Sequence, residues 1–342
     1  MVTPGAGLRA LADALGERAT LMRPLGPLTT YGVGGPAALF VEIDGPEDLE
    51  PVRIALRDGA GGAAVFVIGR GSNLLVADAG FDGIVVHLGS GFAGLELPAS
   101  VPAPGARSVQ GEAEATVRAG AALALPVLAR RVADAGWSGL AWAVGVPGSV
   151  GGAVRMNAGG HGSDMAACLA RYRWVDLTGP GGGTGDVEAL DYGYRRSSVS
   201  GTQLVLEAEL LVTPGTTEAE QEAVAAIVRW RRAHQPGGSN AGSVFTNPED
   251  DSAGRLVEAA GLKGFGIGTA HVSEKHANFI QADDGGSADD VKRLTDHVRA
   301  AVAERFGVEL STEVRLVGFA EADNGGVEPE DDVAETGTGE SR

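Results

Sequence analysis

The chain has 342 residues, of which 44% are hydrophobic and 21% charged, a composition typical of a globular enzyme with two or three domains. Its 45 acidic and 27 basic residues give a net charge of −18, which disfavours nucleic acid and anionic membranes as partners, because both bind to basic surfaces. A single cysteine, Cys168, excludes an intrachain disulfide and fits a reducing compartment, so we expect a cytoplasmic protein.

The first part of the chain predicts an alternation of strands and helices. Residues 1–28 form an expected lead-in with a short helix near 8–15, and no signal peptide is expected because no basic segment precedes an apolar run. Short apolar runs predict strands at 38–43, 64–68, 84–88 and 115–119. Helices are expected at 46–57 and 122–135, and a loop at 91–111.

A glycine-rich turn, Gly69-Arg-Gly-Ser-Asn73, follows the second expected strand. Dinucleotide sites occur at such strand ends in α/β folds. This turn lacks the third glycine of a Rossmann fingerprint, and no helix follows it directly, so the Rossmann interpretation is weak.

A second glycine-rich stretch, Gly145-Val-Pro-Gly-Ser-Val-Gly-Gly-Ala153, lies inside an uncharged run over 135–154. The run is long enough to suggest a membrane span, but its six glycines and Pro147 argue against a helix of that length. We expect a bare backbone loop whose N–H groups approach a ligand closely. Two interpretations stay open: a cradle for a dinucleotide pyrophosphate, or a tight buried turn.

The second half predicts strands at 171–177, 203–212 and 313–319, with a flexible turn at 179–185. Two capping patterns open helices: Thr217-x-x-Glu220 begins a helix that runs to about 233, and Ser287-x-x-Asp290 begins one that Gly307 ends. Beyond residue 320 the composition is acidic with almost no large apolar side chain, which predicts disorder.

Three further segments carry residues capable of chemistry, and each has a simpler interpretation. Tyr192-Gly-Tyr-Arg-Arg-Ser197 offers guanidinium groups for a carboxylate or phosphate, or forms a solvated loop. Ser243 presents a hydroxyl as a proton donor or ligand contact, or belongs to a polar loop. Glu313 and Arg315 share one face of a strand, as a polarised pair or as a surface ion pair. No metal-ligand spacing is present.

Seven motifs occur in an order that resembles the UDP-N-acetylenolpyruvoylglucosamine reductase family, also called UDP-N-acetylmuramate dehydrogenase, in its shorter subtype. They are Thr29-Thr-Tyr-Gly-Val-Gly-Gly-Pro36, Ile68-Gly-Arg-Gly-Ser-Asn-Leu-Leu75, Gly145–Ala153 with Met156-Asn-Ala-Gly159, Tyr194-Arg-Arg-Ser197, Ala241-Gly-Ser-Val-Phe-Thr-Asn-Pro248, Gly261-Leu-Lys-Gly264 and Val272-Ser-Glu-Lys-His-Ala-Asn-Phe279. The resemblance spans residues 28–319.

The resemblance implies an α+β chain with an FAD-binding fold of the vanillyl-alcohol oxidase type and a C-terminal substrate-binding domain. The implied domains are a lead-in over 1–28, two FAD-binding subdomains over 29–215, a substrate-binding domain over 216–320 and an acidic tail over 321–342. In the implied reaction NADPH reduces FAD, and hydride then reaches the enolpyruvyl group of a UDP-sugar to give UDP-N-acetylmuramate for peptidoglycan. We expect a monomer.

The resemblance also implies roles for individual residues. Arg195 would stabilise negative charge on the substrate carboxylate, Ser243 would donate the proton, and Glu313 would assist. The implied cofactor-binding residues are Gly69, Arg70, Gly71, Ser72, Asn73, Val146, Pro147, Gly148, Ser149, Gly151, Gly152, Ala153 and Arg315. The implied substrate-binding residues are Tyr194, Asn247, Lys275 and His276.

Two positions depart from the family pattern, and two other functions compete with a reductase. Thr246 stands where lysine is common and His161 where tyrosine is common, which puts substrate-diphosphate contacts in question. The alternatives are a flavin-dependent sugar or alcohol oxidase of the same fold, and a flavin-binding module without catalysis. Arg195, Ser243 and Glu313 together favour the reductase over both.

Overall fold

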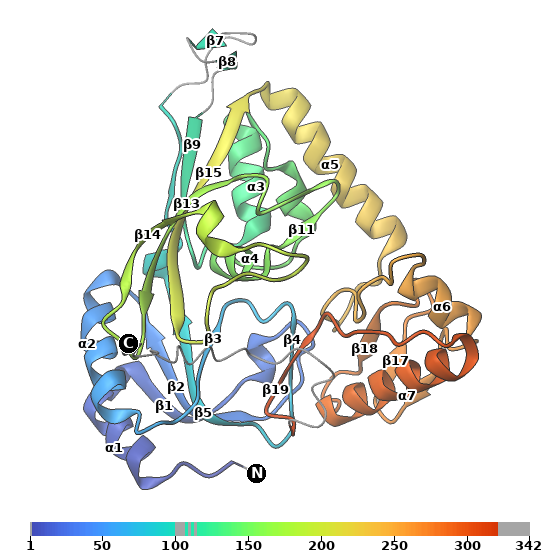
Figure 1. The fold of residues 1–342 in the computed structure, drawn as a ribbon, viewed down its shortest axis with the longest axis horizontal. Coiled ribbons are helices and arrows are strands. Elements are labelled where there is room, and N and C mark those ends of the chain that lie inside the picture. Colours follow the sequence, from blue (N-terminus) through green and yellow to red (C-terminus); the bar gives the residue numbers. More distant parts are fainter. Residues whose placement is uncertain (1, 100–106, 109–110, 113–114, 321–342) are drawn as a thin grey trace, which may run out of the picture.

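The computed structural model describes residues 2–99, 107–108, 111–112 and 115–320 (Figure 1). The acidic segment 321–342, for which the sequence predicts disorder, lies outside the described residues, as does part of the loop expected at 91–111.

The first sheet has the strand order β1-β2-β5-β3. Its strands are β1 (Ala19–Pro24), β2 (Pro36–Ile43), β3 (Val65–Ile68) and β5 (Phe81–Leu88). β2, β5 and β3 run parallel, whereas β1 pairs antiparallel with β2 at the edge. The expected lead-in therefore contains a strand that its sequence did not reveal, because β1 has no fully buried residue and shows no alternation of apolar and polar side chains.

Two helices cover one side of this sheet, α1 (Ala6–Leu15) and α2 (Pro46–Gly59) (Figure 1). Leu11 and Leu15 of α1 are buried, as are Val52 and Leu56 of α2. Both helices therefore hold the parallel strands by apolar contact.

The second sheet is antiparallel in the order β14-β13-β15-β9-β6. Its strands on this path are β6 (Leu95–Glu96), β9 (Ala115–Gly120), β13 (Leu169–Asp176), β14 (Gly182–Asp186) and β15 (Gln203–Pro214). A short sixth strand, β10 (Trp137–Ser138), also pairs with β15. The flexible turn expected at 179–185 is partly strand β14, since glycine-rich backbone pairs with β13 without any side-chain pattern.

Helices α3 (Leu125–Asp134) and α5 (Thr217–His234) pack on each other beside the second sheet (Figure 1). The cap of α5 is Thr216, whose hydroxyl accepts from the backbone N–H of Ala219 at 3.3 Å, one residue earlier than the sequence pattern indicated. Val224 of α5 belongs to the same buried cluster as the two sheets, so this helix packs on the cofactor side of the domain boundary expected at 216.

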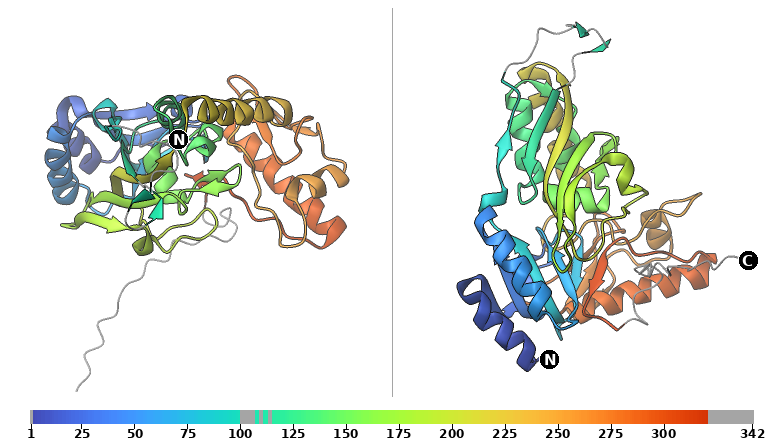
Figure 2. Two further views of the ribbon diagram at one scale, coloured as in Figure 1. Left: turned by 90° about the horizontal axis from the view of Figure 1, so that it is seen from above. Right: turned by 60° about the vertical axis from the view of Figure 1, so that its left-hand side comes forward.

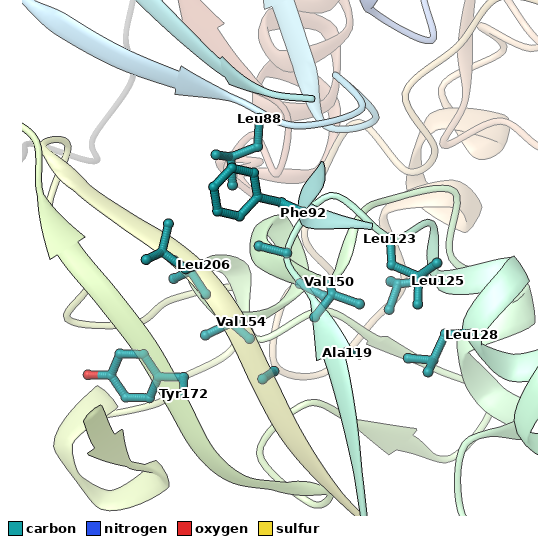
Figure 3. Packing of buried hydrophobic residues seen from close by; sticks show 14 of the residues in the cluster. Leu88, Phe92, Ala119, Leu123, Leu125, Leu128, Val150, Val154, Tyr172 and Leu206 are labelled. Atoms are coloured by element: carbon teal, nitrogen blue, oxygen red, sulfur yellow. The ribbon is translucent and has the colours of Figure 1, made fainter. Parts of the chain in front are cut away.

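The uncharged run over 135–154 is folded into short helices in the largest core cluster. It contains η4 (Ala141–Gly145) and α4 (Val150–Met156), so the bare loop expected at 145–153 is helical from Val150 onward. Val150 and Val154 are fully buried, and Figure 3 shows them among apolar side chains of both sheets. This apolar anchoring explains the helix despite its glycines. None of the described helices combines the length and apolar character needed to cross a membrane.

The C-terminal part lies to one side of the two sheets (Figure 2). It contains α6 (Ala253–Ala259), a meander of β16 (Gly266–Ile267), β17 (Ala270–Val272) and β18 (Ile280–Ala282), and α7 (Ala288–Phe306). Ser287 caps α7 as predicted, and Gly307 ends it with φ at 67°. The predicted stripe from Val291 to Val302 is buried in a second core cluster.

The chain then returns to the first part. β19 (Arg315–Val317) pairs in parallel with β4 (Leu74–Val76), a three-residue strand directly after the Gly69–Asn73 turn. Asp78, just beyond β4, accepts from the backbone N–H of Ala288 at 3.0 Å and of Asp289 at 3.1 Å. The start of α7 is therefore tied to the cofactor side of the molecule.

The carboxylate of Asp290 in α7 is the basis for a pH-dependent stability prediction. The Arg293 guanidinium, with the N–H and hydroxyl of Thr269, lowers the pKa of Asp290 from 3.8 to about 2. Because the folded pKa lies below the unfolded one, its stabilisation is complete above pH 3.8 and is lost as the pH falls toward 2.

We therefore expect Asp290→Asn to lower the free energy of unfolding by a constant amount between pH 7 and pH 5, and by less and less below pH 4. Urea unfolding at fixed pH values measures this. Asp284→Asn is the control, since Asp284 is exposed and makes no polar contact. A deficit of Asp290→Asn that stayed constant down to pH 2 would contradict the assignment.

Candidate active site

Two adjoining cavities occupy the region where the glycine-rich segments meet. The strand cavity, of about 320 Å³, is lined at one end by Glu42 and Gln203. The arginine cavity, of about 280 Å³, is lined by Arg195, Ser243 and Glu313. Six residues line both cavities and form the waist between them: Val67, Gly69, Arg70, Ser149, Gly152 and Arg155.

The structure places every predicted cofactor-binding residue in the wall of one or both cavities. Gly151 lines the strand cavity, and the remaining twelve line the arginine cavity. These twelve are Gly69, Arg70, Gly71, Ser72, Asn73, Val146, Pro147, Gly148, Ser149, Gly152, Ala153 and Arg315. Three parts of the chain, at 69–73, 146–153 and 315, therefore converge on adjoining cavities.

The backbone of this space fits an anionic dinucleotide. The N–H groups of Arg70, Gly71 and Ser72 donate to no acceptor within the described part of the chain. A Cβ at Gly71 would lie 2.2 Å from the carbonyl oxygen of Leu28, and the φ of Gly71 is +56°, so only glycine fits there. A Cβ at Gly152 would meet only Ser149 Oγ, at 3.5 Å, and would project into the cavities. The free donors and absent Cβ atoms suit FAD.

The second glycine-rich stretch is partly closed to a ligand. The N–H of Val150 donates to the carbonyl of Leu123, and the N–H of Gly151 donates to that of Ala121, both at 2.9 Å. These two N–H groups therefore donate within the protein and are not available to a ligand. The open interpretation of residues 145–153 as a cradle narrows accordingly to Gly148, Ser149 and Gly152.

The wall of the arginine cavity contains an ion pair between Arg195 and Glu313. Arg195 Nε donates to Glu313 Oε1 at 2.7 Å, and the two side chains are 25% and 11% exposed. The sequence paired Glu313 with Arg315 as strand neighbours, and both line the cavity, but the carboxylate partner is Arg195.

The Arg195 side chain is held at three of its five N–H groups. Beyond Glu313, Arg195 Nη2 donates to the carbonyl of Gly159 at 3.0 Å and Nη1 to that of Asn157 at 3.3 Å. Two N–H groups remain for an acceptor in the cavity. The Tyr194 ring packs against the guanidinium with 5.0 Å between the ring centre and Arg195 Cζ. Burial and the Glu313 charge raise the pKa of Tyr194, so its hydroxyl stays protonated.

Ser243 is placed beside Glu313 by backbone hydrogen bonds of its neighbours. The N–H of Glu313 donates to the carbonyl of Val244 at 2.8 Å. The buried Asn278 amide holds Phe245 from both sides, accepting from its N–H at 3.0 Å and donating to its carbonyl at 2.8 Å. The Ser243 hydroxyl therefore projects from a rigid segment into the cavity that contains the Arg195–Glu313 pair.

Three of the four predicted substrate-binding residues do not line either cavity; Tyr194 does. The Asn247 side chain accepts from the N–H of Ala253 at the start of α6. Lys275 Nζ donates to the carbonyl of Arg232 at the end of α5. His276 packs edge-on against Phe279, and burial lowers the pKa of its imidazole.

The two departures from the family pattern also lie outside the cavity walls. The Thr246 hydroxyl donates to the carbonyl of Ser311 at 3.4 Å. His161 packs edge-on against Trp230 of α5 with ring centres 5.1 Å apart, and burial and Arg231 lower the pKa of its imidazole. Neither residue is placed by the structure against the Arg195–Glu313 pair.

Two arginines of the site were missed by sequence reasoning. Arg155, the first charged residue after the uncharged run, lines both cavities, and Arg231 of α5 lines the arginine cavity. The signal for Arg155 was its position behind two glycines, whereas Arg231 is one of several arginines in α5 and carried none. With Arg70, Arg195 and Arg315 they give five guanidinium groups against one carboxylate, Glu313.

Comparison with known proteins identifies this arrangement. Residues 45–180 match the family described as FAD binding domain, and residues 234–317 match UDP-N-acetylenolpyruvoylglucosamine reductase, C-terminal domain. The reductase of Heliobacterium modesticaldum is 40% identical over 89% of this chain and 93% of its own length, and that of Bacillus subtilis 39% over 86% and 92%. The crystal structure of the Thermus caldophilus reductase superposes with a TM-score of 0.69 at 32% identity, over 87% of this chain and 98% of that one.

The fold and the two cavities thus define an FAD-binding oxidoreductase, and the α+β architecture with an FAD-binding fold of the vanillyl-alcohol oxidase type is confirmed. More narrowly, the chain belongs to the UDP-N-acetylenolpyruvoylglucosamine reductase family, as its seven sequence motifs predicted.

The backbone of Arg195 gives a prediction that separates its function from its contribution to stability. Arg195 has φ at +54°, a conformation that costs a residue with a Cβ about 1 kcal/mol more than glycine. We expect Arg195→Gly to be more stable than Arg195→Ala by about that amount, since both variants lose the same ion pair. Urea unfolding of the two proteins measures the difference.

The same two substitutions at Arg171 serve as the control. Arg171 lies in strand β13 and pairs with Asp186 on the surface. There Ala should be more stable than Gly, the usual order for a strand. If the Ala variant were more stable than the Gly variant at both sites, the Arg195 backbone would not be strained.

Proposed function

We propose that this chain reduces UDP-N-acetylglucosamine enolpyruvate to UDP-N-acetylmuramate with NADPH as hydride donor and FAD bound in the two cavities. The observation that carries the proposal is the Arg195–Glu313 pair next to Ser243, inside a cavity with five arginines and one carboxylate. Relatives that bear the reductase name are about 40% identical over most of the chain, which supports the same activity.

Bound FAD supplies the two-electron carrier that takes hydride from NADPH and delivers it to the enolpyruvyl group. The residues of the chain bind and orient the substrate and supply the proton. Gly69–Asn73, Gly148, Ser149 and Gly152 would hold the cofactor through the unused backbone donors and the open space above the glycines.

Arg195 is suited to stabilise the charge that develops on the substrate carboxylate. Hydride addition to an enol ether conjugated with a carboxylate places negative charge on that carboxylate. Two N–H groups of Arg195 remain free for it, and their direction is fixed by the contacts to Glu313, Gly159 and Asn157. A donor fixed in advance stabilises developing charge without reorganisation in the transition state.

Ser243 is suited to supply the proton to the carbon next to the site of hydride addition. A hydroxyl is a weak acid, but the developing carbanion is a strong base, so transfer is feasible where the geometry is held. Glu313 holds Arg195 with one carboxylate oxygen, and its backbone is bonded to Val244 beside Ser243. Glu313 therefore fixes the position of Ser243, the proposed proton donor, relative to Arg195.

The proposal includes a monomer, since Arg195, Ser243 and Glu313 line one cavity of a single chain. It also includes a cytoplasmic location, since a chain with one cysteine forms no intrachain disulfide and fits a reducing compartment. We also propose that the substrate-binding part begins after α5. The second core cluster, which collects residues from Ala241 onward with a few from 31–75, supports this boundary.

The test of the proposal is NADPH oxidation by the purified FAD-loaded protein, with and without UDP-N-acetylglucosamine enolpyruvate. Oxidation that requires this substrate supports the reductase. Substrate-independent formation of peroxide would favour the oxidase of the same fold instead. A protein that cannot be loaded with FAD would refute every flavin-dependent function.

Ser243→Ala tests the assignment of the proton donor. We expect the flavin to be reduced by NADPH at the wild-type rate and reoxidised by the UDP-sugar about 100-fold more slowly or worse, since general acid catalysis contributes about 10²–10⁴-fold. Stopped-flow absorbance measures the two half-reactions separately. Ser239→Ala, in the same segment but outside both cavities, should leave both rates unchanged. Equal losses in the two half-reactions would assign Ser243 a structural role.

A further inference from the structure

Arg155 is a cation without a carboxylate partner at the waist between the two cavities. It lies in the last turn of α4 and lines both cavities. Its one hydrogen bond within the described part of the chain is from Nη1 to the carbonyl of Ser200, at 2.5 Å. Four of its five N–H groups therefore have no acceptor among the residues that the structure describes.

The surroundings of Arg155 oppose its charge. Burial and then repulsion from Arg315 lower the pKa of Arg155 to about 10, and burial lowers the pKa of Arg315. Arg155 is still charged at neutral pH. A partly buried cation without a counter-ion destabilises the folded chain. An anionic ligand that binds to the guanidinium offsets this destabilisation.

The position of Arg155 determines which part of a bound dinucleotide it contacts. FAD carries its only formal charges on the pyrophosphate, midway between the flavin and the adenosine. When a molecule extends through both cavities, its middle part lies at the waist. Arg315 lines only the arginine cavity, so the cations that line both cavities are the partly buried Arg155 and the exposed Arg70.

The backbone near Arg155 leaves little alternative charge for the pyrophosphate. The N–H groups of Val150 and Gly151 are taken by internal carbonyls, and α4 has only seven residues. Gly152 has no Cβ, which keeps the space beside α4 at the waist open. The formal positive charge at the waist therefore comes from the side chains of Arg70 and Arg155, next to the free N–H groups of the Gly69–Asn73 turn.

We propose that Arg155 is the counter-ion of the FAD pyrophosphate, which it holds through its guanidinium fork where the cofactor crosses between the cavities. This inference rests on the proposed use of FAD and adds a specific residue that the family motifs do not assign. A bidentate guanidinium–phosphate contact adds geometry as well as charge.

The experiment compares ligands that contain or lack the pyrophosphate. FAD is removed from the purified protein, and titration calorimetry measures the binding of FAD, ADP and adenosine. Arg155→Gln should weaken FAD and ADP by about 10- to 100-fold and leave adenosine unchanged. Arg155→Lys should fall between, because it keeps the charge and loses the fork. Arg171→Gln, a surface arginine in strand β13, is the control and should match wild type.

The melting temperature of the FAD-free proteins separates this role from a structural one. Without FAD, Arg155→Gln should be as stable as wild type or more stable, because an unpaired buried charge has been removed. The increase on adding FAD should be smaller in Arg155→Gln than in wild type. A lower melting temperature without FAD, with ADP and adenosine weakened equally, would show that Arg155 merely supports the fold.

Two other results would overturn the inference in distinguishable ways. If Arg155→Gln shifts the midpoint potential of the bound flavin while ADP affinity stays at the wild-type value, Arg155 acts on the flavin ring and the pyrophosphate assignment is wrong. If wild-type protein binds neither FAD nor ADP, the proposed cofactor site itself fails, and the role of Arg155 fails with it.

Discussion

The active site depends on the return of the C-terminal strand to the first glycine-rich turn. The Asn73 side chain donates to the carbonyl of Glu313, 240 positions later in the chain, at 3.0 Å. The carbonyl of Asn73 accepts from the N–H of Arg315, also at 3.0 Å. A turn proposed to hold the cofactor thus fixes both the acid and an arginine of the site. Because the β4–β19 pair is only three residues long, the cap that Asp78 gives to α7 reinforces the same junction.

The second constraint is electrostatic. A chain with a net charge of −18 repels anions over most of its surface, so an anionic cofactor and substrate require a local excess of positive charge. The arginine cavity supplies it with five guanidinium groups and a single carboxylate. That carboxylate is already paired with Arg195, which leaves four cations whose charge the described side chains of the cavity do not neutralise. Arg155 and Arg231 are partly buried, so water screens their charges less than those of the exposed Arg70 and Arg315.

Short-range patterns in the sequence were sufficient for much of the fold. The caps and apolar stripe predicted α7, and apolar runs predicted β2, β3 and β5 close to their observed bounds. Three strands were not predictable from local patterns. The edge strand β1 is largely exposed, β14 is glycine-rich, and the apolar β4 has only three residues and pairs with β19, about 240 positions later in the chain. The family motifs indicated Arg195, Ser243 and Glu313, but not that Glu313 pairs with Arg195, because that contact joins loops 118 residues apart. Arg155 and Arg231 carried no motif, and their roles emerge only from the cavity walls.

The arginines of the site divide into two kinds with different energetic consequences. Arg195 has its counter-charge in Glu313, so its position is set before any ligand arrives, which is the condition for stabilising a transition state. The backbone strain at Arg195, with φ at +54°, is tolerated because three hydrogen bonds, one of them the ion pair with Glu313, fix the same conformation. Arg155 and Arg315 have no such partner within the described chain, and their mutual repulsion is relieved only by an anion. Folding and cofactor binding are therefore linked: a ligand at 100 times its dissociation constant adds about 2.7 kcal/mol to the stability of the native state. The unpaired charge of Arg155 at the waist lowers the stability of the FAD-free protein, and the proposed contact with the pyrophosphate offsets this loss.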